Sequence, residues 1–303
     1  GQWGVAFRWL GDNTEYGVYA MNYHSRTPIL STQNADAATI LNAIQAGQAA
    51  GGILGDPAMG GLVTAASLVG NGNYFMDYPE DIRLYGASFS TMLPTGTAWQ
   101  GEISYRPNAP VQINTQAMTL KLASSITEQI AAAGGGAAGV AAGMAMGGFD
   151  NRGYNRKEIT QIQSTFTHFF DQVLGAERAT LVGEVGFTHV GGLESKEKTR
   201  YGRDANFGIK GSLVDPGDTS VQKFGDHGYV TANSWGYRVR AILDYNDVFA
   251  GVNLKPNMAF SHDVDGYSPG PVGAFNEGSM AVSFGIDAEY QNMYTASIGY
   301  TNF

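Results

Sequence analysis

The sequence predicts an all-β protein, a transmembrane antiparallel β-barrel of about ten strands with helical insertions in its long loops. Three observations support this fold class. Apolar and polar residues alternate over segments of about ten residues, which match a tilted strand crossing a bilayer and exceed the usual globular strand. Connections between these segments are alternately short and long. The polar side of the alternation is rich in Gly, Ser, Gln and Asn, as expected for the wall of a hydrated lumen.

Alternation is clearest at 234–245, where Trp235 and Tyr237 alternate with Gly236 and Arg238. Because successive side chains of a strand point to opposite faces, such a segment has one apolar and one polar face. The same pattern is regular at 1–10, 97–106, 280–290 and 294–302. It is weaker at 14–24, 81–92, 158–170, 179–190 and 249–261. Each of these segments is predicted to be a strand.

The connections predict which rim of the barrel carries the loops. Short ones lie near 11–13, 93–96, 171–178, 246–247 and 292, and long ones lie at 25–80, 107–157, 191–229 and 262–277. Short turns at one rim and long loops at the other are typical of outer-membrane barrels. We therefore interpret residues 1–303 as a single outer-membrane β-barrel domain, in which loops 25–80 and 107–157 carry the helical insertions.

A sheet in hydrocarbon must close, because every backbone amide needs a hydrogen-bond partner there. The ten strands either close alone or belong to a larger cylinder. Phe303 shares the parity of Thr301 and not that of the lipid-facing Tyr300. We therefore expect the chain to be a fragment of a longer polypeptide that continues past Phe303.

Composition excludes several classes of protein. The chain has 303 residues, no cysteine, 42 glycines and a net charge of −9. Without cysteine there is no disulfide framework, thiolate metal site or cysteine nucleophile. The acidic balance argues against nucleic acid as a partner, because phosphates require a basic surface. No stretch has the roughly 18 to 20 uninterrupted apolar residues of a membrane helix.

Several ordered blocks of the sequence resemble a known family. They are YPEDIRLYGASFS at 78–90, GEISYRPNAP at 101–110, NSWGYRVR at 233–240, DYNDVFAGVNLKP at 244–256 and FSHDVDGYSPGP at 260–271. These blocks are similar to the C-terminal half of the proteobacterial outer-membrane family DUF1302, over most of residues 78–303. The resemblance implies a barrel in the outer membrane of Gram-negative bacteria, apolar cargo, and a periplasmic protein and an inner-membrane exporter as partners. It implies no catalytic residue.

Charged residues on the polar faces are the candidates for lining the lumen. They are Arg8, Glu102, Arg106, Glu184, Arg238, Arg240, Asp244, Lys255, Asp287 and Glu289. Opposed charges across a barrel interior brace the wall as ion pairs, or they create a transverse field that orients polar solutes. Both interpretations stay open, and they are compatible.

Two segments of the long loops have helical spacing. Residues 34–46 combine an Asn or Asp cap with Ile40, Leu41 and Ile44, and residues 116–131 place Met118, Leu122, Ile126 and Ile130 four apart. Glycines at 135, 139, 143 and 147 continue this spacing, which favours close helix packing but equally fits a flexible linker. The apolar faces of such helices must be buried against each other, a partner or an apolar ligand.

Signals for metals and enzymes are weak. The five histidines have no HxxxH or HxH spacing, and Asp263–Gly266 resembles part of a calcium loop but fits a turn better. We predict a porin-like channel or transporter, embedded in outer-membrane lipid, for a small hydrophobic or amphipathic molecule, with no cofactor and no covalent chemistry. One alternative is a structural barrel whose loop helices dock a partner protein or other copies in an oligomer. Another is a barrel hydrolase, using Ser261 with His262 or Ser164 with His168.

Overall fold

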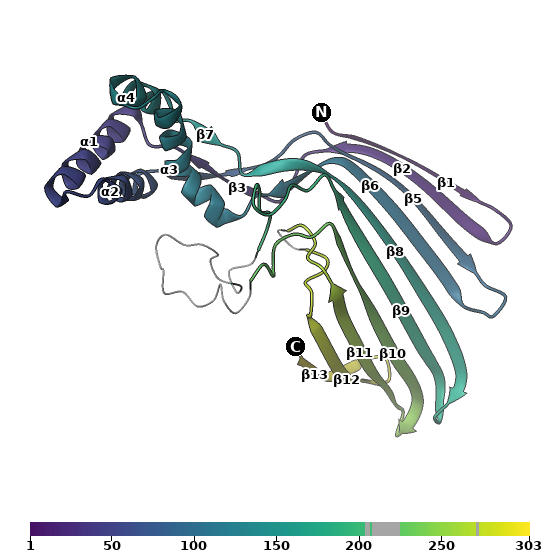
Figure 1. Ribbon diagram of the computed structural model, residues 1–303. Helices are drawn as coiled ribbons and strands as arrows, with labels where there is room; N and C mark the ends of the chain where they lie inside the picture. The colour runs from purple at the N-terminus through teal and green to yellow at the C-terminus, as the bar shows by residue number, and fades with distance from the viewer. Residues whose placement is uncertain (204–206, 208–224, 271–272) are drawn as a thin grey trace.

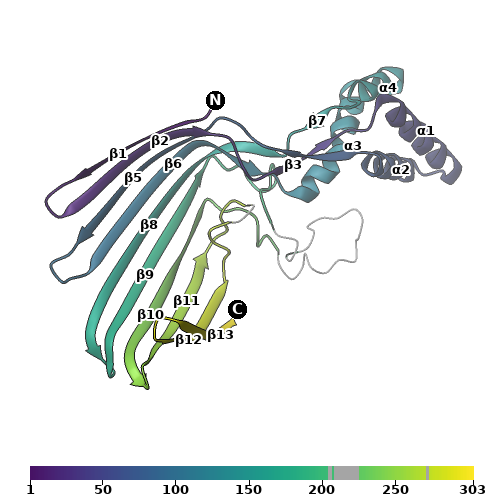
Figure 2. The ribbon, with the colours of Figure 1, turned by 180° about the vertical axis from the view of Figure 1, so that it is seen from behind.

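The computed structural model describes residues 1–203, 207, 225–270 and 273–303. Ten of its strands form one curved antiparallel sheet (Figure 1, Figure 2). They are β1 (Trp3–Leu10), β2 (Thr14–Tyr23), β5 (Ile82–Met92), β6 (Ala98–Gln112), β8 (Tyr154–Val173), β9 (Ala176–Gly191), β10 (Asn233–Phe249), β11 (Val252–Asp265), β12 (Met280–Tyr290) and β13 (Tyr294–Asn302). Each pairs with the next in this order. The predicted strands are thereby confirmed.

Short turns lie at one rim of the sheet and long connections at the other. The turns are 11–13, 93–97, 174–175, 250–251 and 291–293, and the long connections are 24–81, 113–153, 192–232 and 266–279. Parts of the last two connections lie outside the described residues. We call the side with the long connections the long-loop rim and the other side the short-turn rim.

Within the described residues the sheet is open. Strands β1 and β13 are its two edges and do not pair with each other. Every residue of both strands is exposed. The ten strands therefore do not close alone, which was one of the two arrangements considered from the sequence.

The strand register gives the sheet one apolar and one polar face. One row of register partners is Phe7, Val18, Ala87, Ile103, Ile162, Phe187 and Trp235. The adjacent row is Arg8, Gly17, Ser88, Glu102, Gln163, Gly186, Gly236 and Asp263. We call these the apolar face and the polar face. Side chains of the apolar face are widely exposed, as is expected only for a surface that contacts lipid or a partner.

An aromatic belt lies on the apolar face near the short-turn rim. Trp9 stacks on Tyr16 with ring centroids 5.5 Å apart. Trp99 packs edge-on against Phe89 at 4.8 Å and stacks on Phe166 at 5.8 Å. Aromatic rings concentrate at this depth where a barrel meets the membrane interface.

Several strands are longer than the roughly 9 to 11 residues that cross a bilayer. Strand β8 has 20 residues and β9 has 16. Near the long-loop rim their apolar residues are no longer exposed. Ile159 and Val190 are buried there in a cluster with Met118, Tyr201 and Val230. The wall therefore continues into a packed unit beyond the rim.

A helical cap projects from the long-loop rim (Figure 1). It consists of α1 (Ala37–Leu54), α2 (Pro57–Gly70), α3 (Thr115–Ala132) and α4 (Gly136–Ala145), with a small sheet of β3 (Ile29–Gln33), β4 (Asn73–Asp77) and β7 (Asp150–Asn151). Asp36 begins α1 by accepting a 2.8 Å hydrogen bond from the Thr39 amide. None of the helices in the described residues is long and apolar enough to span a membrane.

The predicted helix faces pack mostly against each other. Ile40, Ile44 and Ile126 are buried in one cluster with Leu68, and Ile130 packs at its edge. Leu122 is also buried, whereas Leu41 is half-buried and Met118 joins the cluster at the rim. The structure therefore favours burial within the cap over burial against a ligand.

Glycines allow the helices of the cap to pack closely. A Cβ atom at Gly47 of α1 would lie 2.5 Å from the carbonyl oxygen of Gly60 in α2, so neither position accepts a larger residue without movement. A Cβ atom at Gly139 of α4 would lie 3.0 Å from the carbonyl oxygen of Ile130 in α3, and one at Gly143 would lie 2.9 Å from the Ile130 side chain. The linker interpretation of the glycine-rich segment is wrong, because its centre forms α4.

Candidate functional site

Three hollows follow one another along the polar face. The mouth cavity, of about 620 Å³, lies at the long-loop rim. A middle hollow of about 270 Å³ and a lower hollow of about 280 Å³ follow it. Gln161, Thr188 and Ala274 line both the mouth cavity and the middle hollow, while Glu102 and Gln163 line both the middle and the lower hollow. We call this series the polar track.

The mouth cavity combines an apolar wall with polar groups. Ile29, Ile82 and Ile159 are buried in its wall. Arg106 also lines it and donates from Nη2 to Oε1 of Gln161 at 2.5 Å. The cavity can therefore contact a molecule that has one apolar and one polar part.

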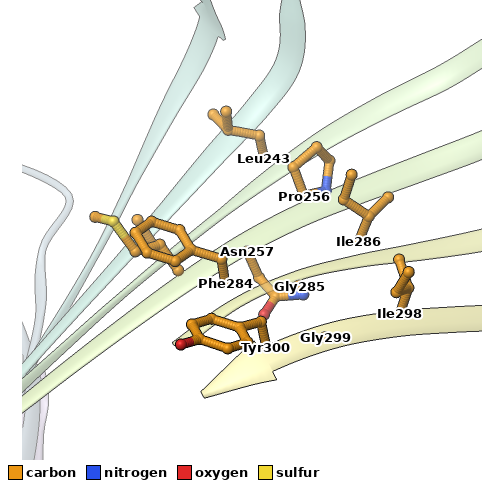
Figure 3. Close-up of a pocket in the computed structure, with 11 residues that line it drawn as sticks. Leu243, Pro256, Asn257, Phe284, Gly285, Ile286, Ile298, Gly299 and Tyr300 are labelled. Atoms are coloured by element: carbon orange, nitrogen blue, oxygen red, sulfur yellow. The ribbon is translucent and has the colours of Figure 1, made fainter. Parts of the chain in front are cut away.

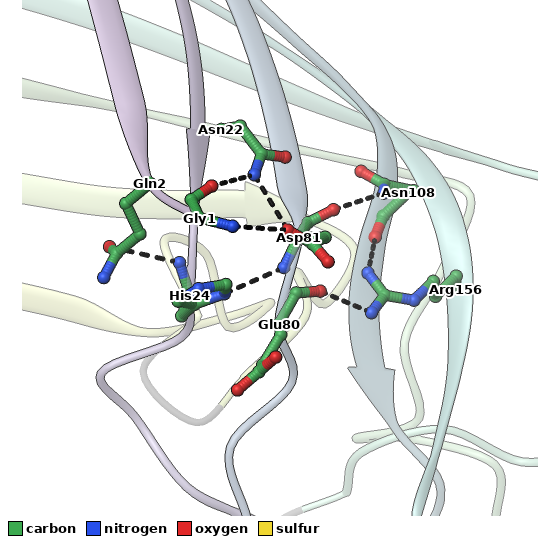
Figure 4. A network of polar contacts seen from close by, with 8 residues as sticks. All are labelled: Gly1, Gln2, Asn22, His24, Glu80, Asp81, Asn108 and Arg156. Carbon is green, nitrogen blue, oxygen red and sulfur yellow. Dashed lines mark hydrogen bonds and ion pairs between the residues drawn. The ribbon is translucent and has the colours of Figure 1, made fainter.

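A network of hydrogen bonds holds the edge of the mouth cavity (Figure 4). Gln2 and His24 line the cavity, and Oε1 of Gln2 accepts from the His24 amide at 3.3 Å. The amide of Asp81 donates to Nδ1 of His24 at 3.0 Å, and its carboxylate accepts from Asn22 at 2.9 Å. This bond from Asn22 lowers the pKa of Asp81. Arg156 of β8 donates to the carbonyl of Glu80 at 2.6 Å. This bond attaches the segment of Glu80 and Asp81 to β8.

Described residues of the connection 266–279 cover part of the polar track and make it narrower. Phe275 is buried and lies against the polar face, where a Cβ atom at Gly186 would come within 2.8 Å of its ring. The guanidinium of Arg238 lies 5.8 Å from the centre of the same ring. Arg238 also pairs with Asp263 at 3.3 Å, and Asp263 accepts from the Asn276 amide at 3.0 Å. Asp263 thus anchors a loop, but it lies with Asp265 in strand β11, so the preferred turn interpretation of Asp263–Gly266 is wrong for these two residues.

The track contains half of the charged residues proposed from the sequence. Arg8, Glu102, Arg106, Glu184 and Arg238 line it. The other five lie nearer the short-turn rim, outside the track: Arg240, Asp244, Lys255, Asp287 and Glu289. Two of these lie close together, with Lys255 Nζ 3.9 Å from Asp244 Oδ1. A lumen-lining role for all ten stays a prediction.

Sequence reasoning missed the uncharged residues of the track. Gln161, Gln163 and Thr188 lie on the polar face, so parity alone would have identified them. Only charged residues were considered as candidates for the lumen. Phe275 lies in an irregular connection, where no periodicity signals its position.

A buried ion pair fastens the connection 192–232 to the wall. Lys157 Nζ lies 2.7 Å from Glu194 Oε1, and Tyr201 donates to Glu194 Oε2 at 2.6 Å. Burial raises the pKa of Glu194, but the hydrogen bonds from Lys157 and Tyr201 outweigh it and lower this pKa from 4.5 to about 2. Burial raises the pKa of Tyr201. Glu194 is therefore ionised in the folded protein at neutral pH.

Glu194→Gln is expected to weaken this attachment by about 2 kcal/mol at pH 7, because Lys157 loses its ionised partner. The folded-state pKa lies below the unfolded value, so this stability is present above pH 4.5 and is lost as the pH falls towards about 2. Hydrogen exchange of the Gly202 amide, which donates to the Gln112 carbonyl, measures the effect. The exposed Glu197→Gln is the control. Equal exchange in both variants at pH 7 would contradict the assignment.

The histidines proposed for a hydrolase have other contacts. His168 Nδ1 lies 2.7 Å from the Thr97 hydroxyl, and Ser164 accepts from Trp99 Nε1 at 2.8 Å. Ser261 and His262 are adjacent in β11 and point to opposite faces. In the described part of the chain, no three His, Cys, Asp or Glu side chains form a group that could hold a metal ion.

A separate apolar hollow of about 650 Å³ lies on the apolar face of β10 to β13 (Figure 3). The side chains around it include Leu243, Pro256, Phe284, Ile286, Ile298 and Tyr300. It is on the opposite face from the polar track and shares no lining residue with the three hollows described above. We therefore treat it as part of the apolar outer surface.

The antiparallel ten-stranded sheet, its two faces and its unequal rims define a β-barrel wall of the outer-membrane type. The chain belongs to the family described as Protein of unknown function (DUF1302), whose model matches residues 1–303. A crystal structure of a Pseudomonas aeruginosa FadL homologue is similar, with 16% identity and a TM-score of 0.38. The similarity covers 99% of this chain and 57% of that chain, so this chain spans little more than half of that homologue. No curated protein matches the sequence.

Proposed function

We propose that the protein is an outer-membrane conduit, which moves a small amphipathic or apolar molecule along the polar track without covalent chemistry. The observation that carries this proposal is the continuity of the track. Its three hollows share lining residues, from the mouth cavity to Arg8 in β1 and Glu15 in β2. Isolated surface pits would not share walls in this way.

The orientation in the membrane follows from the two faces and the two rims. The apolar face contacts the hydrocarbon of outer-membrane lipid, and the aromatic belt lies at one interface. Short turns of such barrels face the periplasm, and long loops face outward. The helical cap therefore lies outside the Gram-negative cell, and the mouth cavity opens to the outside.

The chemistry of the track favours an amphipathic molecule. Its mouth has a wall of buried isoleucines, whereas Gln161, Gln163 and Glu184 provide polar groups further along. A strictly polar solute would gain nothing from the isoleucines. An amphipathic molecule contacts both kinds of wall.

Entry of N-phenyl-1-naphthylamine, an uncharged apolar dye, into intact cells tests the conduit. Cells that produce the full-length protein are expected to take up the dye faster than cells without it. Gln163→Trp places a bulky ring where the middle and lower hollows meet, so it is expected to abolish the gain. Ile103→Trp is the matched control, because Ile103 lies on the apolar face of the neighbouring strand and lines none of the three hollows. Uptake through the Gln163→Trp variant at the unmodified rate would contradict the proposal.

One observation favours an anchoring role as the second candidate. The tip of α1 and α2 exposes Ile53, Leu54, Met59 and Leu62, with Ile53 84% exposed. Asp56 is the single charged residue between 37 and 70. An apolar tip with a single charge, that of Asp56, suits contact with a second copy of the chain. Under this role, the double change Ile53→Ser and Leu62→Ser is expected to convert oligomers to monomers in detergent, as measured by light scattering. An unmodified protein that is already monomeric would contradict the anchoring role.

A further inference from the structure

We propose that the mouth cavity recognises the acidic head group of an amphiphile, a carboxylate or a phosphate, through Arg106 and Thr188. This inference rests on the proposed conduit and specifies its cargo. The tail of the amphiphile lies against the isoleucine wall, and its head group lies at the junction with the middle hollow.

The charge of the cavity supports an anion. Arg26 and Arg106 line it, and its lining residues in the described part of the chain include no Asp or Glu. The carboxylate of Asp81 lies at its edge and accepts a hydrogen bond from Asn22. A cavity lined by basic residues and by no acidic ones is unusual in a chain with a net charge of −9. Further along the track, Glu102 and Glu184 line the middle hollow together with Arg238. An anion is therefore attracted into the mouth by the two arginines.

Two donors in the cavity have no partner among the described residues. They are Nε of Arg106 and the hydroxyl Oγ1 of Thr188, and both atoms are buried. Thr188 is only 1% exposed. A buried polar group without a hydrogen bond costs about 1–3 kcal/mol, so each such group in a folded protein requires an explanation. A carboxylate or phosphate has several oxygens that provide acceptors for these two groups and remove this cost.

The position of these donors explains how head and tail would be separated. Gln161, which holds Nη2 of Arg106, and Thr188 both line the junction between the mouth cavity and the middle hollow. Ile29, Ile82 and Ile159 lie in the wall of the mouth cavity and are absent from the lining of the middle hollow. A single molecule in the mouth cavity can therefore meet the donors at one end and the isoleucines at the other.

Binding of radiolabelled probes to the full-length protein in nanodiscs tests this inference. Equilibrium dialysis at pH 8 compares decanoate, decyl phosphate and decanol, with binding to empty nanodiscs subtracted. We expect at least one acidic probe to bind more tightly than decanol. Arg106→Gln is expected to raise the Kd of that probe about tenfold or more, because a charge-assisted hydrogen bond is lost. Arg83→Gln is the control, since Arg83 is exposed and does not line the cavity.

Thr188→Val keeps the result interpretable if Arg106→Gln fails to fold. Valine preserves the shape of threonine and removes a hydroxyl that has no partner, so folding is expected to be maintained. The Kd of the acidic probe is expected to rise about threefold or more. Whether decanoate or decyl phosphate responds identifies the acid as a carboxylate or a phosphate.

The inference is overturned if decanol binds as tightly as both acids, or if a folded variant binds the acids as the unmodified protein does. These results are distinguishable from failure of the conduit. Dye entry that depends on Gln163, without preference for acidic probes, would refute head-group recognition alone. Acid binding that depends on Thr188, without any dye entry, would refute the conduit and leave a binding protein.

Discussion

Replacing Ile162 by arginine is expected to destabilise the folded protein in a bilayer by about 2–4 kcal/mol. Ile162 is 46% exposed on the apolar face, opposite Ile103 on the neighbouring strand. In the proposed orientation this position contacts hydrocarbon, where a guanidinium loses its hydration. Urea unfolding of the protein in phospholipid vesicles, followed by tryptophan fluorescence, measures the loss.

The next residue in the strand provides the matched control. Gln163 lies on the polar face, so Gln163→Arg places the same charge in a hydrated environment and is expected to change stability little. Equal losses for Ile162→Arg and Gln163→Arg would show that the two faces do not differ in their surroundings.

Replacing Ile126 by alanine is expected to destabilise the helical cap by about 3 kcal/mol, within the usual range for deleting a large buried side chain. Ile126 is fully buried in the cluster that contains Ile40 and Leu68. Hydrogen exchange of amides in α1 and α3 measures the change. Exchange in the wall strands is expected to stay the same, because Ile126 belongs to the core of the cap.

Glu128→Ala is the control for this prediction, because Glu128 is exposed on the same helix. Its effect on exchange is expected to be within about 0.5 kcal/mol. If Ile126→Ala had no larger effect than Glu128→Ala, the cap would not be a packed unit.

The strands could be predicted because each has one face in an apolar and one in a polar environment. Where the two faces no longer differ in polarity, the alternation no longer predicts the strand. For β8 the alternation predicts 158–170, whereas the strand spans Tyr154–Val173. Near the long-loop rim both Tyr154 and Lys157 are buried, so their polarity no longer reports the face. Closure depends on pairing between edges, which no local pattern encodes.

The helices of the cap were predicted where apolar residues repeat every three or four positions. Helix α2 was missed, although Asp56 and Pro57 form a recognisable start for a helix. Its close contact with α1 at Gly60 relies on the absence of side chains, which periodicity does not detect. The small sheet was missed because β3 and β4 have only five residues each.

The candidate site was predicted in part. Parity placed Arg106 and Glu184 on the polar face, and the structure adds that both line the track. The unpartnered hydroxyl of Thr188 and the covering ring of Phe275 result from contacts between distant segments. Such contacts require the three-dimensional structure.

The central claim is that the apolar face contacts lipid and the polar face contacts water. Because the chain has no cysteine, single cysteines at Ile103, Ile162, Ser104 and Gln163 can each carry one nitroxide label. Electron paramagnetic resonance in vesicles then measures collisions with oxygen, which concentrates in lipid, and with a water-soluble nickel complex. We expect oxygen to dominate at 103 and 162 and nickel to dominate at 104 and 163. The same ratio at all four positions, or the reverse pattern, would contradict the account.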